Sequence, residues 1–142
     1  MYVVAWEGMT LSGAVDEHGV FALHSQDTIH NAKKLLNPMD QVARVLQIGE
    51  HVVLWDHVVR AAKHVPAAEH DLRMSDLERK DRQNFEVVMR ACSPRTRAAV
   101  VKFGKEMAED VSGTVAWLEL IHMYIKAFFG KKITMKERYE LI

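Results

Sequence analysis

The sequence has little of several residue types that define special classes of protein. Among its 142 residues there are one cysteine and three prolines. A single cysteine cannot form an internal disulfide, so we expect a reducing, intracellular environment. No apolar run approaches the roughly 20 residues that a membrane-spanning helix needs. The first residues carry no basic group before an apolar run, so we expect no secretory signal.

Charge is equally uninformative about partners. The formal net charge is zero, with 27% charged and 49% hydrophobic residues, values that are typical of globular proteins. The length is that of one domain with a sizeable core. Proteins that bind nucleic acid through a strong basic patch have a clear excess of Lys and Arg. The overall balance therefore does not require such a partner.

The first 54 residues have β-rich character. Short apolar runs at 2–6 and 20–23 predict two strands, and Gly13 and the stretch 16–19 are typical of turns. Two further runs, 43–48 and 51–54, flank Gly49-Glu50, and a Gly-X pair in this position favours a type II′ hairpin.

From Trp55 onward the spacing of apolar residues predicts helices. One is expected over 55–64. A capping box at 75–78 predicts the start of a second, which continues through Phe85 to Cys92. Ser93-Pro94 is a typical N-cap and first helical position. The strongest helix begins at Ser112 or Thr114 and ends at Gly130.

Together these patterns predict an α+β fold that is mostly helical, with a β-rich part at 1–54 and a helical array at 55–142. A second capping box at 134–137 lies close to the last residue. A helix that starts there would be too short to be stable by itself. We therefore expect the chain to be part of a longer protein, truncated at its C-terminus.

The stretch 19–37 is the most informative part of the chain. Asp27 follows an apolar strand and precedes a helix, His30 and Lys33 follow at three-residue intervals, and Asn37 lies one turn later. A carboxylate at the end of a strand is a suitable ligand for the divalent ions of phosphoryl-transfer sites. His30 and Lys33 would then face the phosphate. Alternatively, Asp27 is simply the N-cap of the helix.

The motif Asp27-x-x-His30-x-x-Lys33, with Asn37 after it, resembles the P-element (THAP-domain) family of DNA transposases. That resemblance implies a partial RNase H-like fold at 1–54 and a helical insertion domain at 55–142. It also implies DNA as partner, Mg²⁺ or Mn²⁺ as cofactor bound by Asp27 as the catalytic carboxylate, and a nuclear or cytoplasmic location.

The sequence also departs from the family pattern. Thr28-Ile29 stands where the family usually has two prolines, and the further catalytic acids expected upstream and downstream are not matched. We therefore expect a fragment or domesticated remnant of a transposase that does not cut DNA alone. The alternative is a helical protein-interaction module without catalytic activity.

Two other groups of residues were considered as functional sites. Histidines that gather between residues 51 and 70 could bind a metal, although surface or partly buried histidines are the simpler interpretation. Basic residues between 79 and 97 could contact nucleic acid, but interleaved acids favour a solvated helix face with ion pairs such as Glu78–Arg82 and Glu86–Arg90. The histidines are His51, His57, His64 and His70.

Overall fold

The computed structural model describes the backbone of residues 2–6, 9–15, 21–24, 28–41 and 45–129, and the side chains of residues 28–41 and 45–129. The chain divides into two compact units, residues 1–31 and 32–142. The hairpin that was expected within the first 54 residues lies in the second unit. Among the described helices, none has the length and apolar character needed to cross a membrane.

The first unit contains a three-stranded antiparallel sheet with the strands in sequence order. The sequence does not predict the middle strand, because Gly13 is typical of a turn. Gly13 instead pairs with Tyr2 on one side and Leu23 on the other. The prediction of a turn at Gly13 is therefore wrong, since sheet pairing on both sides holds this residue extended. The strands are β1 (Tyr2–Trp6), β2 (Met9–Val15) and β3 (Phe21–His24).

A helix, α1 (Thr28–Leu36), follows and continues into a short 3₁₀ helix, η1 (Asn37–Asp40). Pro38 stands at the start of η1, where it has no amide hydrogen to continue the α-helical ladder. The sequence predicted this helix and its end near Asn37. Ala32 and Leu36 are completely buried in the second unit.

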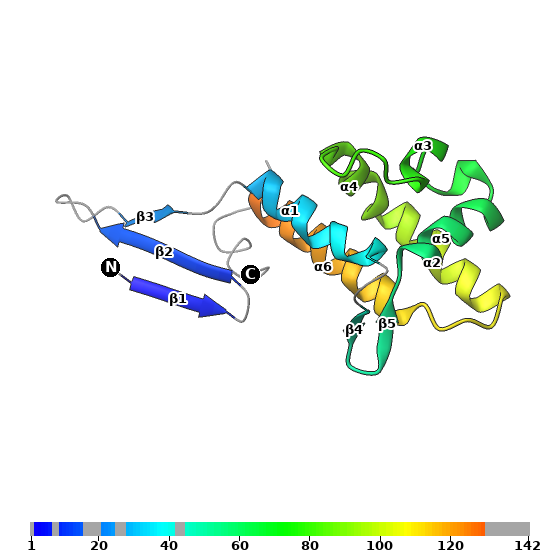
Figure 1. Ribbon diagram of the computed structural model, residues 1–142, viewed down its shortest axis with the longest axis horizontal. Coiled ribbons are helices and arrows are strands. Elements are labelled where there is room, and N and C mark those ends of the chain that lie inside the picture. The colour runs from blue at the N-terminus through cyan, green and yellow to red at the C-terminus, as the bar shows by residue number, and fades with distance from the viewer. Residues whose placement is uncertain (1, 7–8, 16–20, 25–27, 42–44, 130–142) are drawn as a thin grey trace. The chain divides into compact units, whose positions relative to one another are not determined.

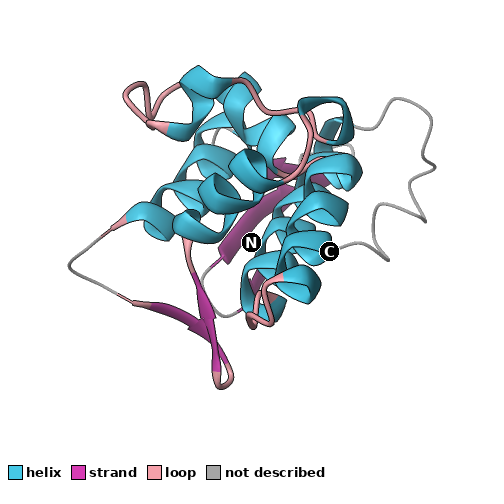
Figure 2. Ribbon diagram, turned by 90° about the vertical axis from the view of Figure 1, so that its right-hand side faces the viewer, coloured by secondary structure: helices cyan, strands magenta, loops and turns pink. Residues whose placement is uncertain are grey.

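A small hairpin, β4 (Leu46–Ile48) and β5 (His51–Val53), comes next. Gly49 has φ of +60°, which agrees with the predicted type II′ turn because that turn needs a positive φ at its first central residue. The hairpin stands out from the helices in two views of the molecule (Figures 1 and 2).

The rest of the described chain is helical (Figure 1). α2 packs against α5, and α6 packs against both α5 and strand β5. The side chain of Trp117 in α6 donates a hydrogen bond to the carbonyl of Leu35 in α1, at 2.8 Å, so α1 lies against α6. The elements are α2 (Trp55–His64), η2 (Ala67–Glu69), α3 (Met74–Leu77), α4 (Phe85–Ala91), α5 (Pro94–Glu106) and α6 (Ser112–Phe129).

These helices enclose one hydrophobic core. Its centre is made of residues whose side chains are almost completely removed from solvent, and every helix with more than four residues contributes to it. Burial of this apolar surface is the main favourable contribution to folding. The largest buried side chains include Leu36, Val53, Val58, Val88, Val100, Leu118 and Ile121.

The predicted helix over 75–92 is wrong in one respect, because it is interrupted. α3 ends at Leu77, and α4 begins only at Phe85. Asp81 accepts a hydrogen bond from the amide of Gln83, and Asn84 caps α4 by accepting from the amide of Glu86. Such side chains compete with helix continuation. The predicted pair Glu78–Arg82 therefore does not form.

Helix α5 begins as the sequence predicts. The hydroxyl of Ser93 accepts a hydrogen bond from the amide of Thr96, and Pro94 occupies the first turn. The other end of α5 was not predicted in detail. Ala108 follows it with φ of +51°, and the amide of Glu109 donates to the carbonyl of Gly104 at 2.9 Å. This is the Schellman arrangement that usually has glycine at the left-handed position.

Ala108→Gly is therefore expected to stabilise the protein by about 0.5–1 kcal/mol, because glycine adopts positive φ without steric cost. Urea unfolding monitored by circular dichroism measures this change. The matched control is Ala116→Gly on the exposed face of α6, which should destabilise by about 1 kcal/mol. Destabilisation by both substitutions would show that Ala108 is not strained.

Candidate functional site

The structure describes only some of the site residues that the sequence predicts. Asp27 lies outside the described residues, so its N-cap and metal-ligand interpretations both remain predictions. His30 and Lys33 lie on α1, where His30 is exposed and Lys33 half-buried. The next residue, Lys34, is also exposed. The structure thus places two of the three predicted residues together on one short helix.

Asn37, the fourth residue of the motif, has a structural contact. Its side-chain oxygen accepts a hydrogen bond from Nη2 of Arg79 at 2.5 Å. Arg79 is 7% exposed, has φ of +49°, and holds its guanidinium carbon 5.2 Å from the ring centre of Trp55. A long side chain rarely adopts such a φ. Asn37 therefore helps to hold a strained, buried arginine.

Three of the four histidines between residues 51 and 70 pair with acids, whereas the fourth, His70, is buried and its Nδ1 accepts a hydrogen bond from the amide of Leu72. His51 Nδ1 lies 2.7 Å from Asp110 Oδ2, and His64 Nε2 lies 2.5 Å from Glu106 Oε2. His57 lies between them and faces Glu109, with Nε2 3.5 Å from Oε1. We refer to these three pairs as the histidine–carboxylate seam. It joins β5 and α2 to the end of α5 and the segment that follows it.

No group of three or more His, Cys, Asp or Glu side chains within the described part of the chain is placed to hold a metal ion. Each seam carboxylate already contacts a histidine or arginine. The metal interpretation of the histidines therefore gains no support from the described residues.

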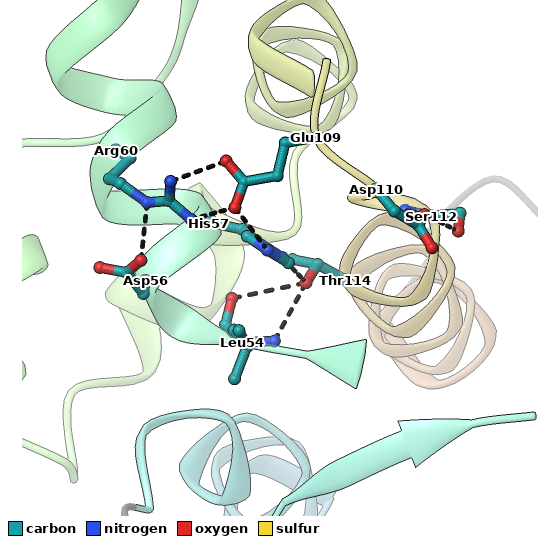
Figure 3. A network of polar contacts seen from close by, with 8 residues as sticks. All are labelled: Leu54, Asp56, His57, Arg60, Glu109, Asp110, Ser112 and Thr114. Carbon is teal, nitrogen blue, oxygen red and sulfur yellow. Dashed lines mark hydrogen bonds and ion pairs between the residues drawn. The ribbon is translucent and has the colours of Figure 1, made fainter. Parts of the chain in front are cut away.

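His57 is the buried centre of the seam, and its environment is shown in Figure 3. Its Nδ1 lies 2.7 Å from Oγ1 of Thr114, which also accepts a hydrogen bond from the amide of Leu54 at 3.0 Å. Burial lowers the pKa of His57, and this outweighs the opposing effect of Glu109. A neutral His57 that accepts from the Thr114 hydroxyl and directs Nε2–H toward Glu109 satisfies these contacts.

An arginine completes the network. Arg60 donates to both carboxylate oxygens of Glu109 and also to Asp56, at 2.6 Å from its Nε (Figure 3). The hydrogen bonds from Arg60 hold the pKa of Glu109 below its usual range. Asp110 likewise has a lowered pKa, first because of the Ser112 hydroxyl and then because of His51. Both acids therefore remain ionised at neutral pH.

Although Thr114, His57 and Glu109 lie in a row, they do not form a nucleophile–base–acid site. Thr114 is completely buried, so no substrate can reach its hydroxyl. The same applies to Cys92, which is completely buried and whose thiol has its pKa raised to about 12 by burial. A reactive cysteine needs an accessible thiolate. The network instead holds the start of α6 against β5 and α2.

The depressed pKa of His57 predicts loss of stability in mild acid. In the unfolded chain His57 has an ordinary pKa of about 6.5, so the unfolded state takes up a proton first as pH falls. The stability that depends on neutral His57 is complete above that pH and decreases as pH falls through the lower folded pKa.

We expect the urea-derived free energy of unfolding to decrease between pH 7 and pH 5, and to decrease less in His57→Gln. The glutamine side chain does not titrate, so the two proteins are compared by how steeply the free energy of unfolding changes with pH. A lower overall stability of His57→Gln does not affect that comparison. Identical slopes in the two proteins would contradict a role for His57.

No protein-family model matches the sequence, and neither a curated protein nor a solved structure shows significant similarity to it.

The residues that sequence reasoning missed are the partners of the histidines. Glu109, Asp110 and Thr114 lie more than fifty residues from His51 and His57. No local spacing links them. The seven-residue separation of His57 and His64 was the available signal, and it indicated a common helix face without identifying what that face contacts.

Proposed function

We propose that this chain is a segment, or a domesticated remnant, of a P-element-like DNA transposase and that it does not cut DNA alone. The order of elements supports this proposal most directly. A three-stranded antiparallel sheet is followed by α1, whose first residue comes immediately after Asp27, and then by the β4–β5 hairpin and the helices from α2 onward. This is the order that the resemblance implies for a partial RNase H-like segment joined to a helical region.

In this proposal Asp27 supplies one carboxylate to Mg²⁺ or Mn²⁺, and His30 and Lys33 face the phosphate. In the intact family the metal ions activate the attacking oxygen and stabilise the leaving oxygen. A pair of such ions needs several carboxylates, and the described part of this chain contains no ready-made group of them. The expected activity of the isolated chain is therefore binding without strand cleavage.

The proposal is tested by incubating the purified chain with supercoiled plasmid and Mg²⁺ or Mn²⁺, and by measuring salt-dependent retention of duplex DNA. We expect retention without nicking. Metal-dependent nicking that Asp27→Ala abolishes would contradict the claim that the chain is inactive alone. Absence of retention at low salt would contradict the DNA-binding proposal itself.

A protein-interaction module is the second candidate, and the surface of α6 favours it. Leu120, Met123 and Phe129 have 41%, 38% and 40% of their surfaces exposed. Leu120 and Met123 lie one turn apart on α6, and adjoining exposed apolar side chains are a feature of protein interfaces. An interaction module would show no salt-dependent DNA retention, so the same measurement separates the two candidates.

A further inference from the structure

Helix α1 presents a group of cations that no described contact neutralises. Within the described part of the chain, the side chains of His30, Lys33 and Lys34 form no hydrogen bond or ion pair, and α1 contains no acidic residue. By helical periodicity these three side chains point to the same side, away from Ala32 and Leu36. The outward face of α1 is therefore a small, uniformly basic surface.

The arginines of the helical array are different, because nearly all are already paired. This includes most of the basic run between residues 79 and 97, which the sequence offered as a nucleic-acid surface. Their carboxylate partners lie within the same unit and offset their charge. The paired cations are Arg60, Arg79, Lys80, Arg82, Arg90, Arg95, Arg97 and Lys102.

The opposite side of α1 is firmly held. Ala32 and Leu36 are completely buried, and Trp117 donates its hydrogen bond to the carbonyl of Leu35 at 2.8 Å. Lys33 and Lys34 therefore extend from a supported backbone in the second unit. A fixed backbone lowers the entropy cost of placing their charges against a ligand.

We propose that Lys33 and Lys34, with His30 one turn before Lys34, contact the phosphate backbone of duplex DNA. This inference rests on the proposed function and extends it by adding Lys34 and by assigning the charge contacts to α1 instead of the arginine-rich helices. Phosphate contacts position a protein on DNA without reading its sequence. The competing explanation is that the lysines only offset the helix dipole at the end of α1.

The test is the dependence of affinity on salt. The full chain is titrated onto a fluorescent duplex of mixed sequence at several salt concentrations, and the slope of log K against log salt is measured. Each phosphate contact contributes about 0.9 to that slope, so the double variant Lys33→Gln/Lys34→Gln should reduce its magnitude by about 1.8. The wild-type slope should exceed that value.

The matched control is Lys63→Gln/Lys105→Gln. Both lysines are exposed, and among the described residues neither side chain has a hydrogen-bond or ion-pair partner. The control removes the same charge and should leave the slope unchanged. Equal losses in the two double variants would indicate diffuse attraction and overturn the assignment to α1.

Other outcomes separate this inference from the proposed function. Wild-type retention with an unchanged slope in Lys33→Gln/Lys34→Gln would overturn the inference and leave the DNA-binding proposal standing. No wild-type retention would reject the proposed function, and the inference with it. Equal α1-dependent binding to duplex RNA or to anionic vesicles would overturn the commitment to DNA.

Discussion

Asp76→Ala is expected to destabilise the protein by about 3–5 kcal/mol, the range found when one member of a buried ion pair is removed. Asp76 is 3% exposed, and its two oxygens accept hydrogen bonds from Nε and Nη2 of Arg90, each at 2.8 Å. The amide of Arg73 donates a third, at 2.9 Å. Removal of the carboxylate leaves Arg90 and the first turn of α3 without these partners.

The pKa of Asp76 supports the same assessment. Burial alone would raise it, but hydrogen bonds from Arg90 and from the amide of Arg73 outweigh burial and lower it. The corresponding stability is present above the ordinary pKa of about 4 and is lost as pH falls through the folded value.

Urea unfolding measures the expected change, with Asp71→Ala as the control. Asp71 also pairs with an arginine, Arg95, at 2.9 Å, but the arginine side chain is 58% exposed. Exposed pairs contribute less than about 1 kcal/mol. A loss for Asp76→Ala no larger than for Asp71→Ala would show that the buried pair is not important. Asp76→Leu/Arg90→Met should recover much of the loss, because no unpaired charge remains.

The prediction for 55–64 matches α2 and rests on apolar spacing, since Leu54 provides no side-chain cap. The capping box predicted at 75–78 is wrong, because α3 begins at Met74 with Arg73 as its N-cap. The start of α5 was predictable from Ser93-Pro94, because that cap involves a side chain and backbone groups a few residues away and the sequence contains the whole interaction. The mostly helical character of an α+β chain was predictable for the same reason.

The break between α3 and α4 was less accessible, because it depends on distant contacts as well as on the local hydrogen bonds of Asp81 and Asn84. Arg79 occupies a left-handed conformation while its side chain reaches Asn37 and Trp55. From its neighbours in sequence alone, Arg79 is a long polar residue that favours a helix. The free energy of those tertiary contacts offsets the backbone strain, and neither partner is near in sequence.

The candidate site shows the same limit. Sequence reasoning identified His30 and Lys33, and the structure locates them on one helix. It could not identify which cations lack partners, since that depends on where every carboxylate lies. The arginine-rich stretch has more basic residues, but ion pairs with acids such as Asp40 and Asp76 offset their charge.

Gly113→Ala is expected to cost about 3 kcal/mol, the upper end of the range for overpacking a well-filled site. A Cβ at residue 113 would lie 2.7 Å from the carbonyl oxygen of Val52 and 2.8 Å from that of His51. Both are backbone atoms of β5, which cannot rotate away as a side chain can. The start of α6 would have to separate from β5, and the contacts of Thr114 with His57 and Leu54 would be lost with it.

Gly104→Ala provides the comparison for this prediction. Its Cβ would lie 2.5 Å from Cγ2 of Val111, a side chain that can shift, and 3.0 Å from one backbone atom, the carbonyl oxygen of Glu109, which is farther away than either backbone oxygen facing Gly113. Chemical denaturation should therefore show a larger loss for Gly113→Ala than for Gly104→Ala. In Gly113→Ala, amide exchange should accelerate at Leu54, whose N–H donates to Thr114. Unchanged exchange at Leu54 together with a small loss of stability would mean that the close approach of α6 to β5 does not hold the seam together.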